Sequence, residues 1–216
     1  MLRVEPSRTA WRNTTHDWAA DVDLGHLTRI RENPAEFAPG GVLHLILETI
    51  AYPADEAAST GGGRCTVTLH ADGSVSVADQ GRGTDTRLDE RGRPVRKPIM
   101  ATKDLRFFDD PGAETLPDGH ARRGMSVVAA LSEWLVHTNR RANGAWSQRY
   151  EHGIPVTGLE PLAGGGGTGT TVRFLAGAQL APLAEDFGRF AEAWPGLAVD
   201  VDDRRGGRAS AAGAER

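Results

Sequence analysis

One strand-like run in this chain ends in a carboxylate and a glycine turn. The segment VSVADQGRG places Asp79 directly after alternating apolar residues, and Gly81 and Gly83 follow on either side of Arg82. Glycine lets a backbone turn tightly or approach a ligand closely, because it has no side chain. Two interpretations fit the pattern: an ordinary turn with a solvated arginine, or one wall of a nucleotide pocket.

A second group of residues with acid–base chemistry lies on a predicted helix. His44 and Glu48 are four residues apart, so they share one helix face, and Tyr52 follows one turn later. The other residues of this helix are almost all apolar, which would desolvate the carboxylate, raise its pKa and suit it to proton transfer near neutral pH. The imidazole could orient that carboxylate, and the phenol could donate a proton. The alternative is an ordinary pair of surface side chains.

The composition is that of a globular protein. The chain has 216 residues, of which 39% are hydrophobic and 25% charged, and its net charge of −4 favours no direct nucleic-acid contact. Cys65 is the only cysteine, so no intrachain disulfide can form, and the N-terminal stretch lacks the apolar core of a signal peptide. No apolar run is long enough to cross a bilayer. We therefore expect a cytoplasmic protein with no membrane partner.

Local patterns predict the elements that position these residues. We expect a short helix within 23–37 that stops before Pro34, and a helix over 40–59 that kinks or frays near Ala51 and Tyr52 because of Pro53. The other predicted elements are a hairpin over 65–81, a helix running into a strand over 122–141, strands over 144–156 and 169–175, and an amphipathic helix over 181–196. This order predicts an α/β two-layer sandwich.

The chain divides into three predicted segments. Residues 1–27 are polar and read as an N-terminal arm, and residues 28–200 form the domain. Residues 201–216 are small and polar, which predicts a disordered tail.

Five stretches, in order along the chain, carry a family resemblance. They are VLHLILETIAYPADEA, VTLHADGSVSVADQGRG, GMSVVAALSEWL, RYEHGIPVTGLEPL and TGTTVRF. Together they resemble the N-terminal ATPase domain found in the B subunit of DNA gyrase and the E subunit of topoisomerase IV, in a superfamily shared with heat-shock chaperones, histidine kinases and the mismatch-repair protein MutL. The resemblance covers about 28–174. It implies a mixed, mostly antiparallel sheet with helices on one face, a pocket for a small-molecule ligand such as ATP, and a homodimer or a partner protein.

The resemblance implies roles for the residues around the turn. Asp79 would accept a hydrogen bond from the exocyclic amine of adenine, since a buried carboxylate selects a donor edge. Gly81 and Gly83 would let the backbone approach the ring, and Arg82 would shield one wall. Thr170 would help Asp79 to hold the base and a bridging water.

Further residues match the family at the rim of the pocket and on the helix. Ile99 and Met100 resemble an apolar patch that lines the base pocket, with plain core as the alternative. Arg141 matches an arginine that contacts coumarin-type inhibitors, with a strand-end cation as the alternative. Glu48 matches the general base that activates water against the γ-phosphate, and His44 matches its supporting histidine.

Three departures from the family pattern concern the phosphate end. Tyr52 stands where the family has a magnesium-binding asparagine, and a phenol is a poor ligand for Mg²⁺, so we predict no metal site. Arg122 stands at the middle glycine of the phosphate loop, in GHARRG, where it could still bind an anion or could simply begin a surface helix. The chain ends at Arg216, so we do not expect a complete topoisomerase.

Three hypotheses for function follow. The first is a stand-alone gyrase-B-like domain that keeps a ligand pocket, binds ATP at most weakly and has lost efficient magnesium-dependent hydrolysis. The second is a pocket recruited for acid–base chemistry by Glu48, His44 and Tyr52, such as an isomerisation or cyclisation of a small organic substrate. The third is a binding protein, either a decoy for gyrase-directed inhibitors or a regulatory partner of gyrase.

Overall fold

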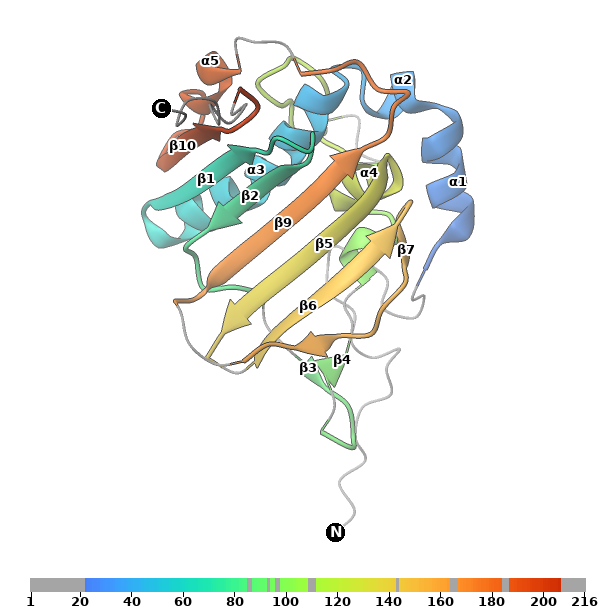
Figure 1. Ribbon diagram of the computed structural model, residues 1–216, viewed down its shortest axis with the longest axis vertical. Helices are drawn as coiled ribbons and strands as arrows, with labels where there is room; N and C mark the ends of the chain where they lie inside the picture. The colour runs from blue at the N-terminus through green and yellow to red at the C-terminus, as the bar shows by residue number, and fades with distance from the viewer. Residues whose placement is uncertain are drawn as a thin grey trace, which may run out of the picture.

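A single mixed sheet and a layer of helices form the domain. We describe residues 22–84, 87–92, 94–95, 98–108, 112–142, 144–163, 167–183 and 187–206 of a computed structural model. The helical segments are α1 (Leu24–Glu32), α2 (Pro34–Phe37), α3 (Val42–Thr60), η2 (Pro98–Met100, a 3₁₀ turn), α4 (Met125–Ala130) and α5 (Gly188–Ala191). In Figure 1 the sheet faces the viewer and α3 and α4 lie behind it. The predicted two-layer α/β sandwich with helices on one face is thus confirmed.

The sheet is antiparallel except at one edge. Its strands are β1 (Gly63–Leu69), β2 (Val75–Asp79), β5 (Ser132–Arg141), β6 (Gly144–Glu151), β7 (Ile154–Pro155), β8 (Glu160–Pro161), β9 (Gly169–Ala176) and β10 (Leu197–Asp203). The order is β10-β1-β2-β9-β5-β6-β7, with β8 also paired to β6. Only β10 runs parallel to its neighbour, β1. A separate two-stranded ladder joins β3 (Arg87–Leu88) and β4 (Pro94–Val95).

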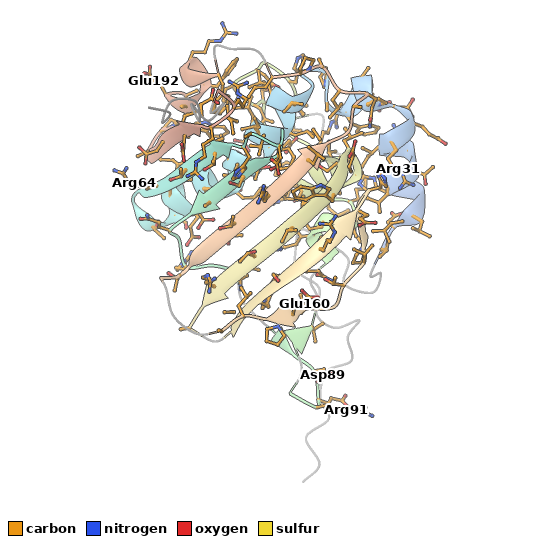
Figure 2. All side chains as sticks on the ribbon, viewed as in Figure 1. Arg31, Arg64, Asp89, Arg91, Glu160 and Glu192 are labelled. Carbon is orange, nitrogen blue, oxygen red and sulfur yellow. The ribbon has the colours of Figure 1, made fainter. Side chains whose placement is uncertain are left out.

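Strand register aligns the side chains that later form the floor of a cavity. Val77 of β2 pairs with Val172 of β9, and Val172 pairs in turn with His137 of β5. All three side chains are buried, on the face of the sheet that the helices cover. Charged side chains such as Arg31 and Arg64 lie at opposite margins of the molecule (Figure 2).

The long helix α3 provides most of the opposite wall. It packs on β1, β2, β10 and α4, and it buries ten residues along its length. The helix continues through Pro53 to Thr60, so the fraying expected near Ala51 and Tyr52 does not occur. Pro53 has no N–H to donate, so this turn of the helix has one hydrogen bond fewer. Ala51 and Pro53 are buried, and their packing stabilises the turn. Gly61 then ends the helix in the left-handed conformation.

Two predictions near the C-terminus differ from the structure. The amphipathic helix predicted over 181–196 is reduced to α5, and residues 181–183 have no regular structure. The carbonyl of Ala181 accepts a hydrogen bond from the N–H of Val42, the first residue of α3. This contact holds Ala181 against the start of α3 in a non-helical conformation. Strand β10 extends to Asp203, into the segment predicted as a tail.

At the other end, α1 begins at Leu24, ahead of the predicted boundary at residue 28, and residues 1–21 lie outside the described residues. Within the part of the chain that the structure describes, no helix has both the length and the apolar character needed to cross a bilayer.

We predict that the Gly169→Ala variant will unfold at a lower urea concentration than the wild type. Gly169 begins β9 with a φ of +143°, and a Cβ at this position would lie 2.1 Å from the carbonyl oxygen of Asp79. Strain of this kind costs roughly 1–3 kcal/mol, so the midpoint of urea unfolding should fall. Gly167→Ala is the control, since its Cβ would meet nothing within 4 Å. Equal midpoints for the two variants would contradict the required close approach of β9 to the end of β2.

Candidate ligand-binding site

Asp79 lies at the end of β2 and faces a cavity. Ala78 pairs with Thr171, so the next residues, Asp79 and Thr170, lie side by side on neighbouring strands. Oδ1 of Asp79 accepts a hydrogen bond from the N–H of Gly81 at 2.8 Å. Burial raises the pKa of the Asp79 carboxyl, against the opposing effect of the N–H groups of Gly81 and Thr170. The carboxyl is therefore partly desolvated and strongly favours a hydrogen-bond donor from a ligand.

The loop after β2 is fastened to β5. Gly83 has a φ of +73°, and a Cβ there would lie 2.4 Å from the carbonyl oxygen of Arg140, so only glycine fits. The buried side chain of Asn139 accepts from the N–H of Thr84 at 2.7 Å and donates to its carbonyl at 3.0 Å. Arg141 donates to the carbonyl of Gly83 at 2.8 Å. These contacts hold the glycine turn in place beside the cavity.

An ion pair joins that loop to α3. Nε and Nη2 of Arg82 donate to the two carboxylate oxygens of Glu56 at 2.6 and 2.8 Å. The hydrogen bond from Arg82 lowers the pKa of Glu56. Because both side chains line the cavity, the pair forms one wall of it. Glu56 was not identified from the sequence.

The cavity has a volume of about 180 Å³ and lies between α3 and the sheet. Seven of the residues predicted for the site line it: Tyr52, Asp79, Arg82, Gly83, Ile99, Met100 and Thr170. Sequence reasoning missed eight others: Thr49, Pro53, Glu56, Val77, Thr84, Met125, His137 and Val172. Period-two alternation could have found Val77 and Val172, which lie two residues from Asp79 and Thr170 on the same faces of their strands.

Glu48 lies outside this cavity and is fully buried. Its Oε2 accepts from the N–H of Gly124 at 2.8 Å, and its Oε1 accepts from the N–H of Arg123. Gly124 precedes α4, so the carboxylate on α3 binds the unpaired N–H groups ahead of that helix. In this structure Glu48 therefore fixes the loop before α4, since both of its oxygens accept hydrogen bonds from that loop.

His44 connects Glu48 to a second carboxylate. Its Nδ1 lies 2.7 Å from Oδ2 of Asp118, and its Nε2 lies 3.4 Å from Oε1 of Glu48. Burial by itself would lower the pKa of His44, but the hydrogen bonds and charges of Asp118 and Glu48 outweigh it and raise the pKa to about 9. The imidazole is thus positively charged at neutral pH. Asp118 carries no motif signal and was missed from the sequence.

Tyr52 lines the cavity. We observe no hydrogen bond from its hydroxyl to Glu48 or His44. Its hydroxyl donates to Oδ2 of Asp104 and accepts from the N–H of Met125, both at 3.3 Å. Burial raises the pKa of the phenol, and the charge of Asp104 raises it further. Of the three residues, Tyr52 lines this cavity, whereas Glu48 and His44 do not.

Arg122 fills the space beyond Tyr52. It is only 1% exposed, and its Nη1 and Nη2 atoms form a bidentate pair with Asp55 at 3.0 and 2.8 Å. Nη1 also donates to Glu114 at 2.7 Å. The guanidinium stacks between the rings of Tyr52 and Phe107, at 4.9 and 4.4 Å from their centroids. Both terminal nitrogens of the predicted anion-binding arginine are thus already bonded to carboxylates.

The residues fit the two ends of ATP differently. The end with Asp79, Thr170 and apolar walls fits a planar amino-heterocycle such as adenine. The residues that the resemblance placed at the phosphate end differ: the guanidinium of Arg122 lies over the ring of Tyr52, and its terminal nitrogens are bonded to carboxylates. At the position where the resemblance implied a magnesium-binding asparagine, the Tyr52 hydroxyl is bonded to Asp104.

The sandwich is that of the gyrase-B-type ATPase fold. The B subunit of DNA topoisomerase 4 of Bacillus subtilis (strain 168) is 33% identical over 156 residues, which are 70% of this chain and 24% of that protein. The DNA gyrase B subunit of Thermotoga maritima is 33% identical over 176 residues, or 77% of this chain and 28% of that protein. The B subunit of DNA topoisomerase 4 of Streptococcus pneumoniae serotype 4 is 34% identical over 175 residues, or 78% and 27%.

The chain belongs to the family of gyrase and topoisomerase IV B subunits, in the part that forms the gyrase-B-type ATPase domain. It spans about a quarter of the length of the curated relatives that it matches. No family model matches it.

We predict that the stability that His44 contributes to the fold is lost at alkaline pH. Its pKa is about 9 in the folded chain, against 6.5 for an ordinary histidine. A raised pKa contributes stability that is fully present below the lower value and is lost as the pH rises through the higher one. The urea midpoint of the wild type should therefore fall between pH 6.5 and 9 relative to that of His44→Gln.

Asp118→Asn is the matched variant for this test, because it removes the nearer carboxylate and keeps the imidazole. It should flatten the same pH dependence. Parallel curves for the wild type and His44→Gln would show that the imidazole is uncharged in the folded chain.

Proposed function

We propose that this gyrase-B-type domain binds a small planar heterocycle carrying an amino group, and that it has lost efficient magnesium-dependent ATP hydrolysis. Adenosine is the simplest probe of this ligand class. In this proposal the domain keeps the ability to bind the ring of the nucleotide. It has lost the ability to bind and activate the triphosphate.

The base end supports this proposal through its polarity and its shape. One desolvated carboxyl, Asp79, projects into a cavity whose other walls include Val77, Met100 and Val172. An apolar slot with few convergent polar groups is the usual form of a small-molecule site. A ring with a donor edge satisfies the carboxyl and buries its two faces against the apolar walls.

Arg122 is the observation that carries the second half of the proposal. A phosphate-binding loop presents backbone N–H groups to an anion. Here the corresponding N–H groups of Arg123 and Gly124 bind Glu48, and the arginine side chain lies between Asp55 and Glu114. A γ-phosphate would have to displace several charge-assisted hydrogen bonds at once. The same bonds to Glu48 disfavour its use as the base of a recruited isomerase, so we do not propose that reaction.

We predict that magnesium-dependent phosphate release from ATP will be absent or very slow. The transition state of phosphoryl transfer needs a metal ion or cations free to neutralise the developing charge. The measurement is phosphate release by the purified chain with and without MgCl₂, alongside Glu48→Ala. A metal-dependent rate that Glu48→Ala abolishes would overturn the proposal, whereas a rate that survives in Glu48→Ala comes from a contaminant.

Titration calorimetry tests the phosphate end more directly. Because the triphosphate finds no open anion site, ATP should bind no more tightly than adenosine, and magnesium should not change that ratio. A clear preference for ATP would show that the contacts of Arg122 open in solution.

We predict that Asp79→Asn will weaken adenosine binding by roughly 1–3 kcal/mol, the cost of losing a charged acceptor and leaving a buried group mispaired. Asp72→Asn is the control, since Asp72 lies in the turn of the same hairpin and outside the cavity. Both variants should melt close to the wild type. Unchanged affinity in Asp79→Asn, with binding intact in the wild type, would place the ring elsewhere.

A further inference from the structure

The floor of the cavity carries a polar side chain that the family resemblance did not mark. His137 of β5 lines it and is only 6% exposed. Strand register places His137 in one row with Val172 of β9 and Val77 of β2, and all three point toward the helices. The imidazole stands edge-on to Trp146, with the ring centroids 4.9 Å apart. Packing against the indole therefore fixes the ring in the floor of the cavity.

An imidazole is chemically out of place in that row. The neighbouring floor residues Val77 and Val172 are aliphatic, and a leucine or valine at position 137 would complete an apolar floor. An imidazole has two ring nitrogens, one a donor and the other an acceptor in its neutral form. It can therefore bond a protein group through one nitrogen and a ligand through the other. His137 thus brings hydrogen-bonding capacity to the floor of a cavity whose walls also carry the carboxyl of Asp79 and the ion pair of Arg82 and Glu56.

The two polar groups lie at opposite sides of the cavity floor. Asp79 is on β2 and His137 is on β5, and β9 lies between these strands. Two strand spacings correspond to about 10 Å between backbones, and Asp79 also lies two residues beyond the row that contains His137, so the two backbones are separated by more than this distance. The cavity volume of about 180 Å³ slightly exceeds the roughly 150 Å³ that accommodates a benzene molecule. A ligand that reaches both groups must therefore be flat, compact and polar at two opposite edges.

We propose that His137 is a specificity-determining residue of this site, and that it selects neutral two-ring nitrogen heterocycles with an amino donor on one edge and a ring nitrogen or oxygen on the other. The amino edge faces the carboxyl of Asp79, and the second edge faces the imidazole of His137. This inference rests on the proposed function, because it names the ligand class of the same cavity.

Three compounds of nearly equal size test the inference. Indole has a ring N–H and no amino group, benzimidazole adds a ring nitrogen acceptor, and 2-aminobenzimidazole adds the amino donor. Calorimetry at a pH above the pKa of 2-aminobenzimidazole, where that compound is neutral, should give the tightest binding by the wild type to 2-aminobenzimidazole. His137→Leu should weaken that binding about tenfold, as expected for one lost hydrogen bond, and should leave indole binding unchanged or improved.

Two further variants separate polarity from packing. His137→Gln keeps a donor and an acceptor, so it should recover most of the lost affinity. His70→Leu removes an imidazole that bonds Ser76 outside the cavity, and it should have no effect. If His137→Leu weakens all three compounds equally and His137→Gln does not recover binding, the imidazole acts through shape and the inference is overturned.

The outcomes also distinguish this inference from the proposed function. Binding of 2-aminobenzimidazole that is lost in Asp79→Asn but unchanged in His137→Leu would overturn the inference and leave the proposed function intact. Failure of the wild type to bind any of the three compounds or adenosine would overturn both.

Discussion

The buried carboxylate of Glu48 fixes the arrangement on which both ends of the cavity depend. A charge inside a protein is tolerated only when hydrogen bonds and opposite charges surround it. Here the N–H groups of Arg123 and Gly124 and the imidazole of His44 supply them. Because Glu48 belongs to α3 and those N–H groups precede α4, one side chain sets the spacing between the two helices and the position of Met125 in the cavity wall.

The same loop position explains why Arg122 is buried among carboxylates. We call this cluster, which lies beyond Tyr52, the anion end of the proposed site. With Arg123 and Gly124 held against Glu48, the preceding Arg122 points inward between Asp55 and Glu114. Its flat guanidinium stacks on Tyr52 and Phe107, a geometry that arginine adopts well because its charge is delocalised and weakly hydrated. Cation and carboxylates neutralise one another without any ligand. Tyr52 and Arg122, the two residues that depart from the family pattern described in the sequence, are thus in contact with each other.

The sequence predicted most of the fold because local signals and long-range packing agree. The hairpin around Asp79 and the helices before Pro34 and after Gly41 follow from alternation, turn residues and proline positions. Sequence reasoning did not predict that, among the described residues of 181–196, only α5 would be helical. The hydrogen bond from the N–H of Val42 to the carbonyl of Ala181 joins segments that are far apart in the chain. Asp118, Glu56 and His137 were missed for the same reason, since their partners become neighbours only through strand register and loop placement.

The two ends of the site rest on different parts of the fold, and this separation lets one change without the other. The base end is built from β2, β9 and β5, where Gly169 and Asn139 fix the approach of neighbouring backbones. The anion end is built from α3 and the loop before α4. Residues with no shared partners contribute to stability and binding nearly independently. Tyr52 is the exception, because its ring lines the cavity while its hydroxyl and face belong to the Arg122 cluster. A ligand that presses on Tyr52 would therefore act on both ends, which limits the size of the heterocycle that the proposed site can accept.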